Sequence, residues 1–439
     1  MLQVLNESSQ HVWSIMDKIV IHGGKKLRGE IFVSGAKNAV LPIMAAALLS
    51  QEESRIENIP DLWDVDTMMK LLRVLGAKVN YVGQTLEINP GNHLKSVAPY
   101  NLVSTMRASV CVLGPILARL GRADVSLPGG CIIGSRPIDL HLKGLETLGA
   151  DITIEHGYVK ARATRGLRGA DVYLGGGYGS SVLATANVMM AATLARGTTC
   201  IEGAACEPEL VDLADFLVKM GARIKGHGSH LIEIEGVPRL SGATHRIIPD
   251  RIEAGTFMVA GAMTRGGDVV VRNCNPEHNR ALLDKLKQAG VIIDKSKDSV
   301  RIRRNGKLRP VEVTTLPYPG FPTDLQAQMM ALATITPGIS VITEKIYPDR
   351  FIHVSELNRM GSKVFLEGSS AIVHGVSHLS GAPVMASDLR ASAALVLAGL
   401  AAEGVTEVHR VYHLDRGYER IEEKLSALGA SVKREKEKG

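Results

Sequence analysis

A glycine-rich stretch between Leu127 and His141 carries residue types that suit covalent or acid–base chemistry. Within seven residues, Pro128 and three glycines surround Cys131, a composition that is typical of a loop. Arg136 follows five residues later, and a nearby guanidinium favours the thiolate form of a cysteine. The stretch lacks the Lys-Ser/Thr ending of a nucleotide-binding P-loop. We therefore expect a reactive thiol here and no nucleoside triphosphatase, although a buried structural cysteine is the plain alternative.

Lys37 and Asn38 lie between a strand-like run and a long apolar segment, in the stretch Ser34–Pro42. A lysine at the start of a helix meets the positive end of the helix dipole, so the position is unfavourable unless an anion binds there. Backbone N–H groups and the amine would then converge on that anion. A solvent-exposed surface lysine explains this stretch equally well, and both interpretations stay open.

The second half of the chain contributes four motifs that contain an acid. They are Phe321–Asp324, Asp349–His353, Asp388–Arg390 and Asp415–Arg420. Three of them pair an acid with an arginine just before a helical run. The plain alternative is a helix cap with a surface ion pair, which contributes well under about 1 kcal/mol. Any one motif alone favours that alternative.

Metal and disulfide chemistry are not expected. The pairs His374/His378 and His409/His413 have the spacing of a helical zinc site, but neither has the following Glu, and both lie in strand-like or turn-like sequence. The five cysteines include no Cys-x-x-Cys pair, which indicates reduced thiols in the cytoplasm and no structural zinc. We expect neither a metal nor another cofactor.

The elements that must position these residues form an internal repeat. Leu-x-x-(Leu/Met/Ala)-Gly occurs six times, at intervals of 68 to 73 residues between its glycines. The glycines are Gly76, Gly149, Gly221, Gly290, Gly361 and Gly429. Each copy predicts an amphipathic helix that ends at the glycine and leads into a short strand.

A second element alternates with the first. Segments rich in Ala, Leu and Met lead through a glycine into a strand, as in Met189–Ala195, Phe257–Met263 and Ala393–Ala398. They are apolar nearly all round, which predicts buried helices. Strands would then cover the outside, the inverse of the usual layering. We predict an α/β fold of two inverse, barrel-like domains, each with three repeats of about 70 residues.

The repeat pattern breaks at Arg246–Arg251. We place one domain at residues 37–248 and the other at residues 16–36 together with 249–439, with residues 1–15 as an N-terminal extension. A solenoid scaffold is less favoured, because solenoid repeats are shorter, about 20 to 50 residues. The space between two domains is a natural site for a small molecule. The segment Arg301–Arg309, with its Asn305–Gly306, predicts an exposed hairpin.

Composition excludes several classes of protein. The 439 residues include 51 Lys+Arg and 45 Asp+Glu, a net charge of +6, and aromatic residues are 4%. So small a surplus with so few aromatic side chains argues against nucleic-acid binding. No apolar stretch approaches the roughly 18 residues of a membrane span, and the first residues do not resemble a secretory signal. We expect a cytoplasmic protein without membrane partners.

Six motifs resemble the UDP-N-acetylglucosamine 1-carboxyvinyltransferase family of enolpyruvyl transferases, in order through residues 16–434. They are Ser34–Asn38, Thr105–Ser109, Pro128–Cys131, Phe321–Asp324, Asp388–Ser392 and Asp415–Arg420. The resemblance implies the same fold of two inverse α/β domains. It also implies transfer of the enolpyruvyl group of phosphoenolpyruvate to the 3-hydroxyl of UDP-N-acetylglucosamine, with release of phosphate. The route implied is addition to a tetrahedral intermediate followed by elimination, at the start of peptidoglycan synthesis.

The resemblance also implies roles for individual residues. Cys131 would protonate the methylene carbon of phosphoenolpyruvate or assist product release, and Asp324 would be the base near the sugar hydroxyl. The implied phosphate ligands are Lys37, Arg136 and Arg416, and the implied carboxylate ligands are Arg350 and Arg390, with Asn38 beside Lys37. The implied UDP-sugar contacts are Arg107, Arg136, Pro137, Ile138, Asp139, Leu140, Ser181, Val182, Asp324 and Ile346. Because these residues come from both halves, we expect the site to be complete only when the domains close.

The chain departs from the family pattern at two positions. Leu183 stands where Ser-Val-Gly is common, and Cys206 stands where an arginine commonly precedes Glu-Pro-Glu. Two alternatives to the implied function remain. One is the related transferase that acts on shikimate 3-phosphate, which lacks the Pro-Gly-Gly-Cys motif. The other is a regulatory paralogue without catalysis, which should have lost its catalytic residues. The oligomeric state stays open.

Overall fold

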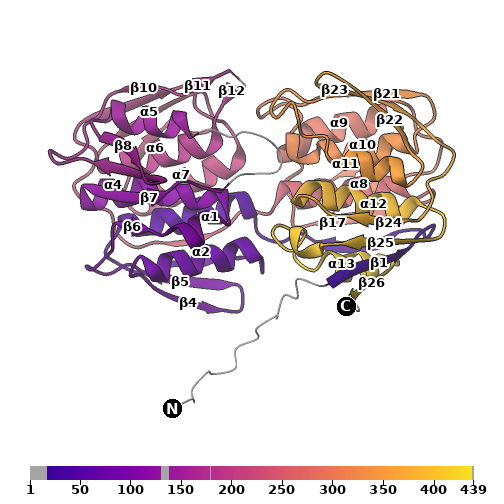
Figure 1. Ribbon diagram of the computed structural model, residues 1–439, viewed down its shortest axis with the longest axis horizontal. Coiled ribbons are helices and arrows are strands. Elements are labelled where there is room, and N and C mark those ends of the chain that lie inside the picture. The colour runs from indigo at the N-terminus through magenta and orange to yellow at the C-terminus, as the bar shows by residue number, and fades with distance from the viewer. Residues whose placement is uncertain (1–16, 130–137, 178, 438–439) are drawn as a thin grey trace, which may run out of the picture.

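The computed structural model describes residues 17–129, 138–177 and 179–437. Two separate hydrophobic cores divide it into two lobes (Figure 1). The first core is built from residues between Ala36 and Ile247, and the second from residues between Ile252 and Val432 together with Ile19–Val33. We call them the first and second lobes. They support the domain division at residues 36/37 and 248/249, which we keep as a proposal.

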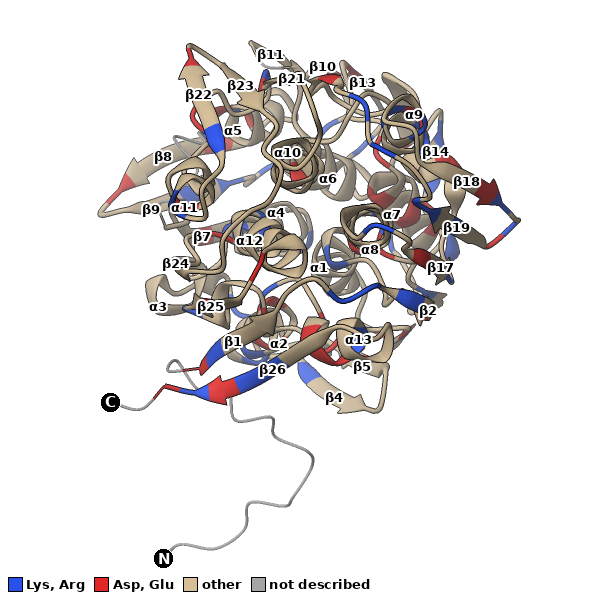
Figure 2. Ribbon diagram, turned by 90° about the vertical axis from the view of Figure 1, so that its right-hand side faces the viewer, with Lys and Arg blue, Asp and Glu red and all other residues tan. Residues whose placement is uncertain are grey.

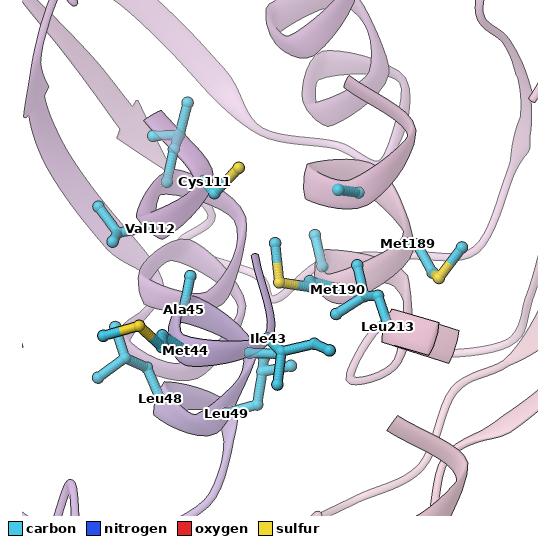
Figure 3. Packing of buried hydrophobic residues seen from close by; sticks show 14 of the residues in the cluster. Ile43, Met44, Ala45, Leu48, Leu49, Cys111, Val112, Met189, Met190 and Leu213 are labelled. Carbon is cyan, nitrogen blue, oxygen red and sulfur yellow. The ribbon is translucent and has the colours of Figure 1, made fainter. Parts of the chain in front are cut away.

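Each lobe has three buried helices at its centre, as the apolar segments predict. They are α1 (Lys37–Ala46), α4 (Leu113–Leu120) and α6 (Val182–Ala192) in the first lobe, and α8 (Arg251–Met263), α10 (Gln326–Thr334) and α12 (Leu389–Ala401) in the second. All thirteen residues of α8 are buried. Figure 3 shows Ile43 and Met44 of α1 within the first core, together with Met190 of α6. Small side chains let the helices pack closely, which explains a core with few aromatic residues.

An amphipathic helix follows each buried helix. These are α2 (Trp63–Val74), α5 (Asp139–Thr147), α7 (Pro208–Lys219), α9 (Arg280–Gln288), α11 (His353–Arg359) and α13 (Ile421–Ala427). The repeated glycine stands just after each of them with φ between +86° and +104°. An L side chain is strained in this left-handed conformation. The helix–glycine–strand prediction is therefore confirmed in all six copies.

Four-stranded sheets cover the helices on the outside. The first lobe has three such sheets, and the strands of each are given in their order across the sheet. The first sheet is β16 (Thr244–Arg246), β3 (Ser54–Glu57), β5 (Thr85–Asn89) and β4 (Lys78–Val82), and the second is β6 (Val97–Ala98), β7 (Arg122–Ser126), β9 (Tyr158–Arg162) and β8 (Asp151–Glu155). The third is β10 (Asp171–Tyr173), β13 (Thr198–Glu202), β15 (Leu231–Glu235) and β14 (Arg223–Lys225). The second lobe has β20 (Glu312–Thr314), β21 (Ile339–Thr343), β23 (Ser370–His374), β22 (Lys363–Glu367); β18 (Ile292–Lys295), β19 (Ser299–Arg303), β17 (Asp268–Arg272), β2 (Arg28–Phe32); and β24 (Pro383–Met385), β25 (Val405–His409), β1 (Asp17–His22), β26 (Ser431–Lys436).

The sheets alternate between an inward and an outward face. In β15, for example, Ile232 and Ile234 are buried while the residues between and beside them are exposed. Figure 2 shows α8, α10 and α12 toward the middle of the second lobe, with charged strands around the rim. The inverse α/β fold predicted from the sequence is thus confirmed. No helix among the described residues is long and apolar enough to cross a membrane.

The two N-terminal strands explain why the first residues belong to the second lobe. β1 pairs antiparallel with both β25 and β26, and β2 pairs parallel with β17. The chain then crosses to the first lobe after Val33 and returns after Ile247, and the two crossings lie side by side. The amide of Ala36 donates to the carbonyl of Ile248 at 2.8 Å, and that of Asp250 donates to the carbonyl of Ser34 at 2.9 Å.

The hairpin predicted for residues 301–309 is wrong. β19 ends at Arg303 and pairs with β17 and β18, and the following residues lead on to β20. The cause lies in Arg304, whose guanidinium donates to the carbonyls of Ala262 and Met263 at 3.1 and 2.8 Å. It thereby satisfies the last carbonyls of α8, which have no partner within the helix, and holds the chain against that helix end.

Candidate active site

The predicted substrate-binding residues lie at helix starts that face the other lobe. Lys37 and Asn38 open α1, Arg390 lies in the first turn of α12, and Asp324 lies in the short helix η4 (Thr323–Leu325) before α10. Asp388 caps α12, because its Oδ1 accepts from the amides of Arg390 and Ala391 at 2.8 and 3.1 Å. Helix N-termini carry partial positive charge, so this region suits anionic ligands.

Asp64 joins Lys37 and Arg416, the two predicted phosphate ligands that the structure describes. Lys37 Nζ lies 2.7 Å from Asp64 Oδ2, and Arg416 Nε donates to Asp64 Oδ1 at 2.9 Å. Burial lowers the pKa of Lys37 against the attraction of Asp64. Burial would raise the pKa of Asp64, but the charges of Lys37 and Arg416 outweigh it and the pKa is lowered. One ionised carboxylate of the first lobe therefore holds a cation from each lobe.

Asp324 joins the predicted carboxylate ligands in the same way. Its Oδ1 lies 2.9 Å from Arg350 Nη1, and its Oδ2 lies 3.1 Å from Arg390 Nη2. Asn38 Nδ2, from the first lobe, donates to Oδ2 at 3.4 Å. Both guanidinium groups are buried. Burial would lower the pKa of Arg390, but the negative charge of Asp324 raises it, so the group stays charged.

Two acids of this region were not predicted. Asp64 lies in the first turn of α2 beside Asp66, where acids are common in any helix. Glu344 is fully buried after β21; its carboxylate accepts from Thr315 Oγ1 at 2.6 Å and from Thr323 Oγ1 at 2.9 Å. No sequence pattern distinguishes Asp64 or Glu344 from an ordinary surface acid, because the residues that bind each of them come from other parts of the chain.

The predicted UDP-sugar contacts gather at neighbouring helix starts of the first lobe. Arg107 opens the short helix η2 (Arg107–Val112), and its charge acts on His141 in α5. Ile138, Asp139 and Leu140 form the start of α5. A Cβ on Gly176, in the hairpin of β11 (Gly175–Gly176) and β12 (Gly179–Ser180), would lie 3.2 Å from Leu140 Cδ1. Ser181 caps α6, and Val182 begins it.

Ile346 belongs to the second lobe and lies in the turn that follows β21. Its amide donates to Glu344 Oε1 at 2.8 Å, and the amide of Lys345 donates to Thr315 Oγ1 at 2.9 Å. Two residues beyond Thr315, Pro317 approaches Gly179 so closely that a Cβ there would lie 2.7 Å from Pro317 Cγ. The predicted UDP-sugar contacts thus follow a path from one lobe to the other.

Cys131, Arg136 and Pro137 lie outside the described residues. The other four cysteines are poor nucleophiles. Burial raises the pKa of Cys111 to about 12 and that of Cys274 to about 11, and it raises the pKa of Cys200 and of Cys206 as well. Cys206 Sγ lies 3.4 Å from His230 Nδ1. A thiol with a raised pKa stays protonated at neutral pH and reacts slowly.

The histidine pairs do not have the geometry of a helical metal site. His374 and His409 end strands β23 and β25, and His413 lies in the short helix η5 (Val411–His413). Residues four apart are neighbours on one face of a helix, whereas along an extended strand they are about 13 Å apart, too far to bind one metal ion. Within the described ranges, no three His, Cys, Asp or Glu residues come together as possible metal ligands.

His141 gives a prediction for stability against pH. Burial, with the charge of Arg107, lowers its pKa from 6.5 to about 3, and its Nδ1 lies 2.9 Å from Asn187 Nδ2. Between these pH values the unfolded chain binds a proton that the folded protein does not, so stability falls as the pH falls. We expect the wild type to lose about 2 kcal/mol more than His141→Gln between pH 6.5 and 4.5.

Urea unfolding at the two pH values measures this difference. The same substitution at the exposed His378 is the control, and it should lose as much stability as the wild type. An equal loss in His141→Gln and the wild type would contradict a neutral, buried His141.

The sequence of the chain is similar to those of known enolpyruvyl transferases. The sequence profile of the family described as EPSP synthase (3-phosphoshikimate 1-carboxyvinyltransferase) matches residues 21–425. A UDP-N-acetylglucosamine 1-carboxyvinyltransferase of Methylacidiphilum infernorum (isolate V4) is 55% identical over 419 residues, 95% of this chain and 99% of the relative. One from Anaeromyxobacter sp. (strain Fw109-5) is 57% identical over 425 residues, 96% of this chain and 100% of the relative.

Solved structures show the same likeness. The enolpyruvyl transferase NikO from Streptomyces tendae superposes with a TM-score of 0.86 at 27% identity, over 96% of this chain and 99% of that one. An EPSP synthase from Acinetobacter baumannii superposes with a TM-score of 0.73 at 20% identity, over 96% of this chain and 100% of that one. At this low identity, the likeness to the EPSP synthase structure shows the fold alone.

Proposed function

The chain belongs to the UDP-N-acetylglucosamine 1-carboxyvinyltransferase family of enolpyruvyl transferases, and from this premise we propose the reaction that its site performs. The chain transfers the enolpyruvyl group of phosphoenolpyruvate to the 3-hydroxyl of UDP-N-acetylglucosamine and releases phosphate. This reaction commits the sugar to peptidoglycan and so serves cell-wall growth, cell shape and division. We place it in the cytoplasm.

The observation that carries the proposal is the pair of carboxylate-centred clusters at the meeting of the two lobes. Lys37 and Arg416 share Asp64, while Arg350 and Arg390 share Asp324. Phosphoenolpyruvate has two anionic groups, a phosphate and a planar carboxylate. The first cluster suits the phosphate, and the paired guanidinium groups suit the carboxylate. Asn38 lies between them, since it is the neighbour of Lys37 and donates to Asp324.

These residues account for each proton and bond of the transfer. In the addition step, Cys131 donates a proton to the methylene carbon, and the sugar 3-oxygen bonds to the adjacent carbon while its proton passes to Asp324. In the elimination step, the new methyl group returns a proton to the Cys131 thiolate and the carbon–oxygen bond to phosphate breaks, which restores the double bond. The proton held by Asp324 leaves with the phosphate. Fixed cations stabilise the charge that develops on phosphate and carboxylate. Arg136 adds a further phosphate ligand.

The UDP-sugar binds along Arg107, residues 137–140, Ser181, Val182 and Ile346. Arg107, residues 138–140, Ser181 and Val182 lie in the first lobe and Ile346 in the second. Sugar binding to both lobes therefore favours the arrangement in which Asn38 lies against Asp324 and Asp64 joins Lys37 to Arg416. The departure at Leu183 falls beside this path and is expected to alter the uridine contacts.

The related transfer to shikimate 3-phosphate is the main alternative. Because the two reactions release the same phosphate, purified protein is supplied with phosphoenolpyruvate and one acceptor at a time. We expect phosphate release with UDP-N-acetylglucosamine and none with shikimate 3-phosphate or without an acceptor. Release with shikimate 3-phosphate would favour the alternative, and release with neither acceptor would favour the regulatory paralogue.

A further inference from the structure

A third polar group lies buried behind the two clusters, and the proposed reaction uses none of its members. It consists of Tyr418, Gln328 and Thr256, whose side chains are between 0% and 1% exposed. They come from three parts of the second lobe: the turn between η5 and α13, helix α10 and helix α8. Buried polar side chains are costly unless they are hydrogen-bonded, so their arrangement needs an explanation.

The hydrogen bonds of this group end at Asp324. The Tyr418 hydroxyl lies 2.9 Å from Thr256 Oγ1, and Gln328 Nε2 donates to the same hydroxyl at 3.1 Å. Gln328 Nε2 also donates to the backbone carbonyl of Asp324 at 3.0 Å. One amide group therefore ties the Tyr418 hydroxyl to the backbone of the proposed base.

The ring of Tyr418 lies against the proposed carboxylate ligand. Arg390 Cζ is 5.3 Å from the ring centroid, within the range of a cation–π contact. Arg390 is 2% exposed, and its Nε and Nη1 have no hydrogen-bond partner among the described residues. Its Nη2 pairs with Asp324. The orientation of this guanidinium therefore depends on the Tyr418 ring together with Asp324.

The turn that carries Tyr418 also carries Arg416, and it packs tightly on the start of α12. A Cβ on Gly417 would lie 2.6 Å from Leu389 Cδ2, so any larger residue would have to displace the Leu389 side chain. The amide of Tyr418 donates to the carbonyl of Leu414 at 3.0 Å. Tyr418 is thus connected to a phosphate ligand along the chain, to a carboxylate ligand through its ring and to the base through its hydroxyl.

We propose that Tyr418, held by Gln328 and Thr256, is a positioning residue that fixes the Arg390 guanidinium relative to Asp324. It thereby aligns the substrate carboxylate with the group that accepts the hydroxyl proton. The ring and the hydroxyl have separate tasks: the ring orients Arg390, and the hydroxyl anchors the amide that holds Asp324. This inference rests on the proposed enolpyruvyl transfer.

The two tasks predict different changes in steady-state constants for phosphate release. Tyr418→Leu removes both the ring and the hydroxyl, so it should raise KM for phosphoenolpyruvate about tenfold and also lower kcat. Tyr418→Phe keeps the ring but removes one of the acceptors of Gln328, whose Nε2 also donates to Thr256 Oγ1 at 3.1 Å. KM should therefore stay within about twofold while kcat falls about tenfold. The control is Phe216→Leu, which removes a fully buried ring in α7 of the first lobe. It should lower the thermal unfolding temperature and leave both constants unchanged.

Thr256→Val serves if Tyr418→Leu does not fold, because valine keeps the shape of threonine and removes only the hydroxyl. That hydroxyl meets Tyr418 and Gln328 and also donates to the carbonyl of Ile252. The variant should lower kcat with KM unchanged, as Tyr418→Phe does. The inference is overturned if Tyr418→Phe and Thr256→Val keep the wild-type kcat, or if Tyr418→Leu matches Phe216→Leu in its constants. An inactive wild type would instead overturn the proposed reaction, so the two failures are distinguishable.

Discussion

A Lys37→Met variant is expected to lose about a thousandfold in kcat/KM for phosphoenolpyruvate. The Lys37 amine is buried, lies 2.7 Å from Asp64 and stands at the N-terminus of α1. Methionine matches the length of lysine without its charge. Asp64 would then keep only Arg416, and its negative charge would repel the incoming phosphate. Removing one fixed group that stabilises developing negative charge raises the reaction barrier by about 2.7–4 kcal/mol, and about 1.4 kcal/mol is a factor of ten in rate.

Steady-state phosphate release measures this loss, and circular dichroism shows whether the variant folds. Lys26→Met is the matched control, since Lys26 is an exposed lysine of the second lobe. It should keep the wild-type kcat/KM. A folded Lys37→Met that retains more than about a tenth of the activity would contradict the placement of the phosphate at this amine.

An Asp324→Asn variant should separate kcat from KM. Asparagine keeps the shape of aspartate but accepts no proton from the sugar hydroxyl, so kcat should fall about 10²- to 10⁴-fold, the usual contribution of a general base. The amide also releases Arg350 and Arg390 from the charge that they share. Both guanidinium groups are then more available to the substrate carboxylate, and KM for phosphoenolpyruvate should stay equal or fall.

The control for this variant is Asp349→Asn, which removes an exposed carboxylate next to Arg350 in the sequence. It should leave both constants unchanged. An Asp324→Asn variant with a raised KM and the wild-type kcat would show that Asp324 only holds the arginines and takes no proton.

The fold could be predicted because its signals are local. A glycine after each amphipathic helix adopts a positive φ wherever the helix must end, so six glycines at regular intervals marked six units. Helices that are apolar on nearly all sides, such as α8 and α12, must be buried inside a domain. The wrong hairpin at residues 301–309 shows the limit, because Asn305–Gly306 is a turn signal that the tertiary contact of Arg304 with the end of α8 overrides.

The candidate site could be predicted only in part. Lys37, Asp324, Arg350, Arg390 and Arg416 stand in motifs, and the structure gathers them into two neighbouring clusters. Asp64 and Tyr418 carried no signal of a partner, because an acid in a first turn and a tyrosine after Arg-Gly have many plain explanations. Their roles depend on partners far along the chain: Arg416 is 352 residues from Asp64, and Thr256 is 162 residues from Tyr418.

The structure also changes the meaning of the net charge of +6. The four described cations of the two clusters do not form an open positive surface, because Asp64 and Asp324 each hold two of them. Each cluster contains two cations and one carboxylate among these residues, which suits the binding of a substrate anion. When a substrate anion binds, it can pair with one cation of a cluster while the carboxylate keeps the other. No buried charge is then left without a partner.

The transfer itself is tested most directly by its product. Wild-type protein is incubated with carbon-13-labelled phosphoenolpyruvate and UDP-N-acetylglucosamine, and the sugar nucleotide is analysed by mass spectrometry and NMR. We predict a labelled enolpyruvyl ether on the 3-oxygen of the sugar, formed in equal amount to the phosphate released. Phosphate released with labelled pyruvate and an unchanged sugar nucleotide would contradict the account, because the chain would then hydrolyse phosphoenolpyruvate rather than transfer its enolpyruvyl group.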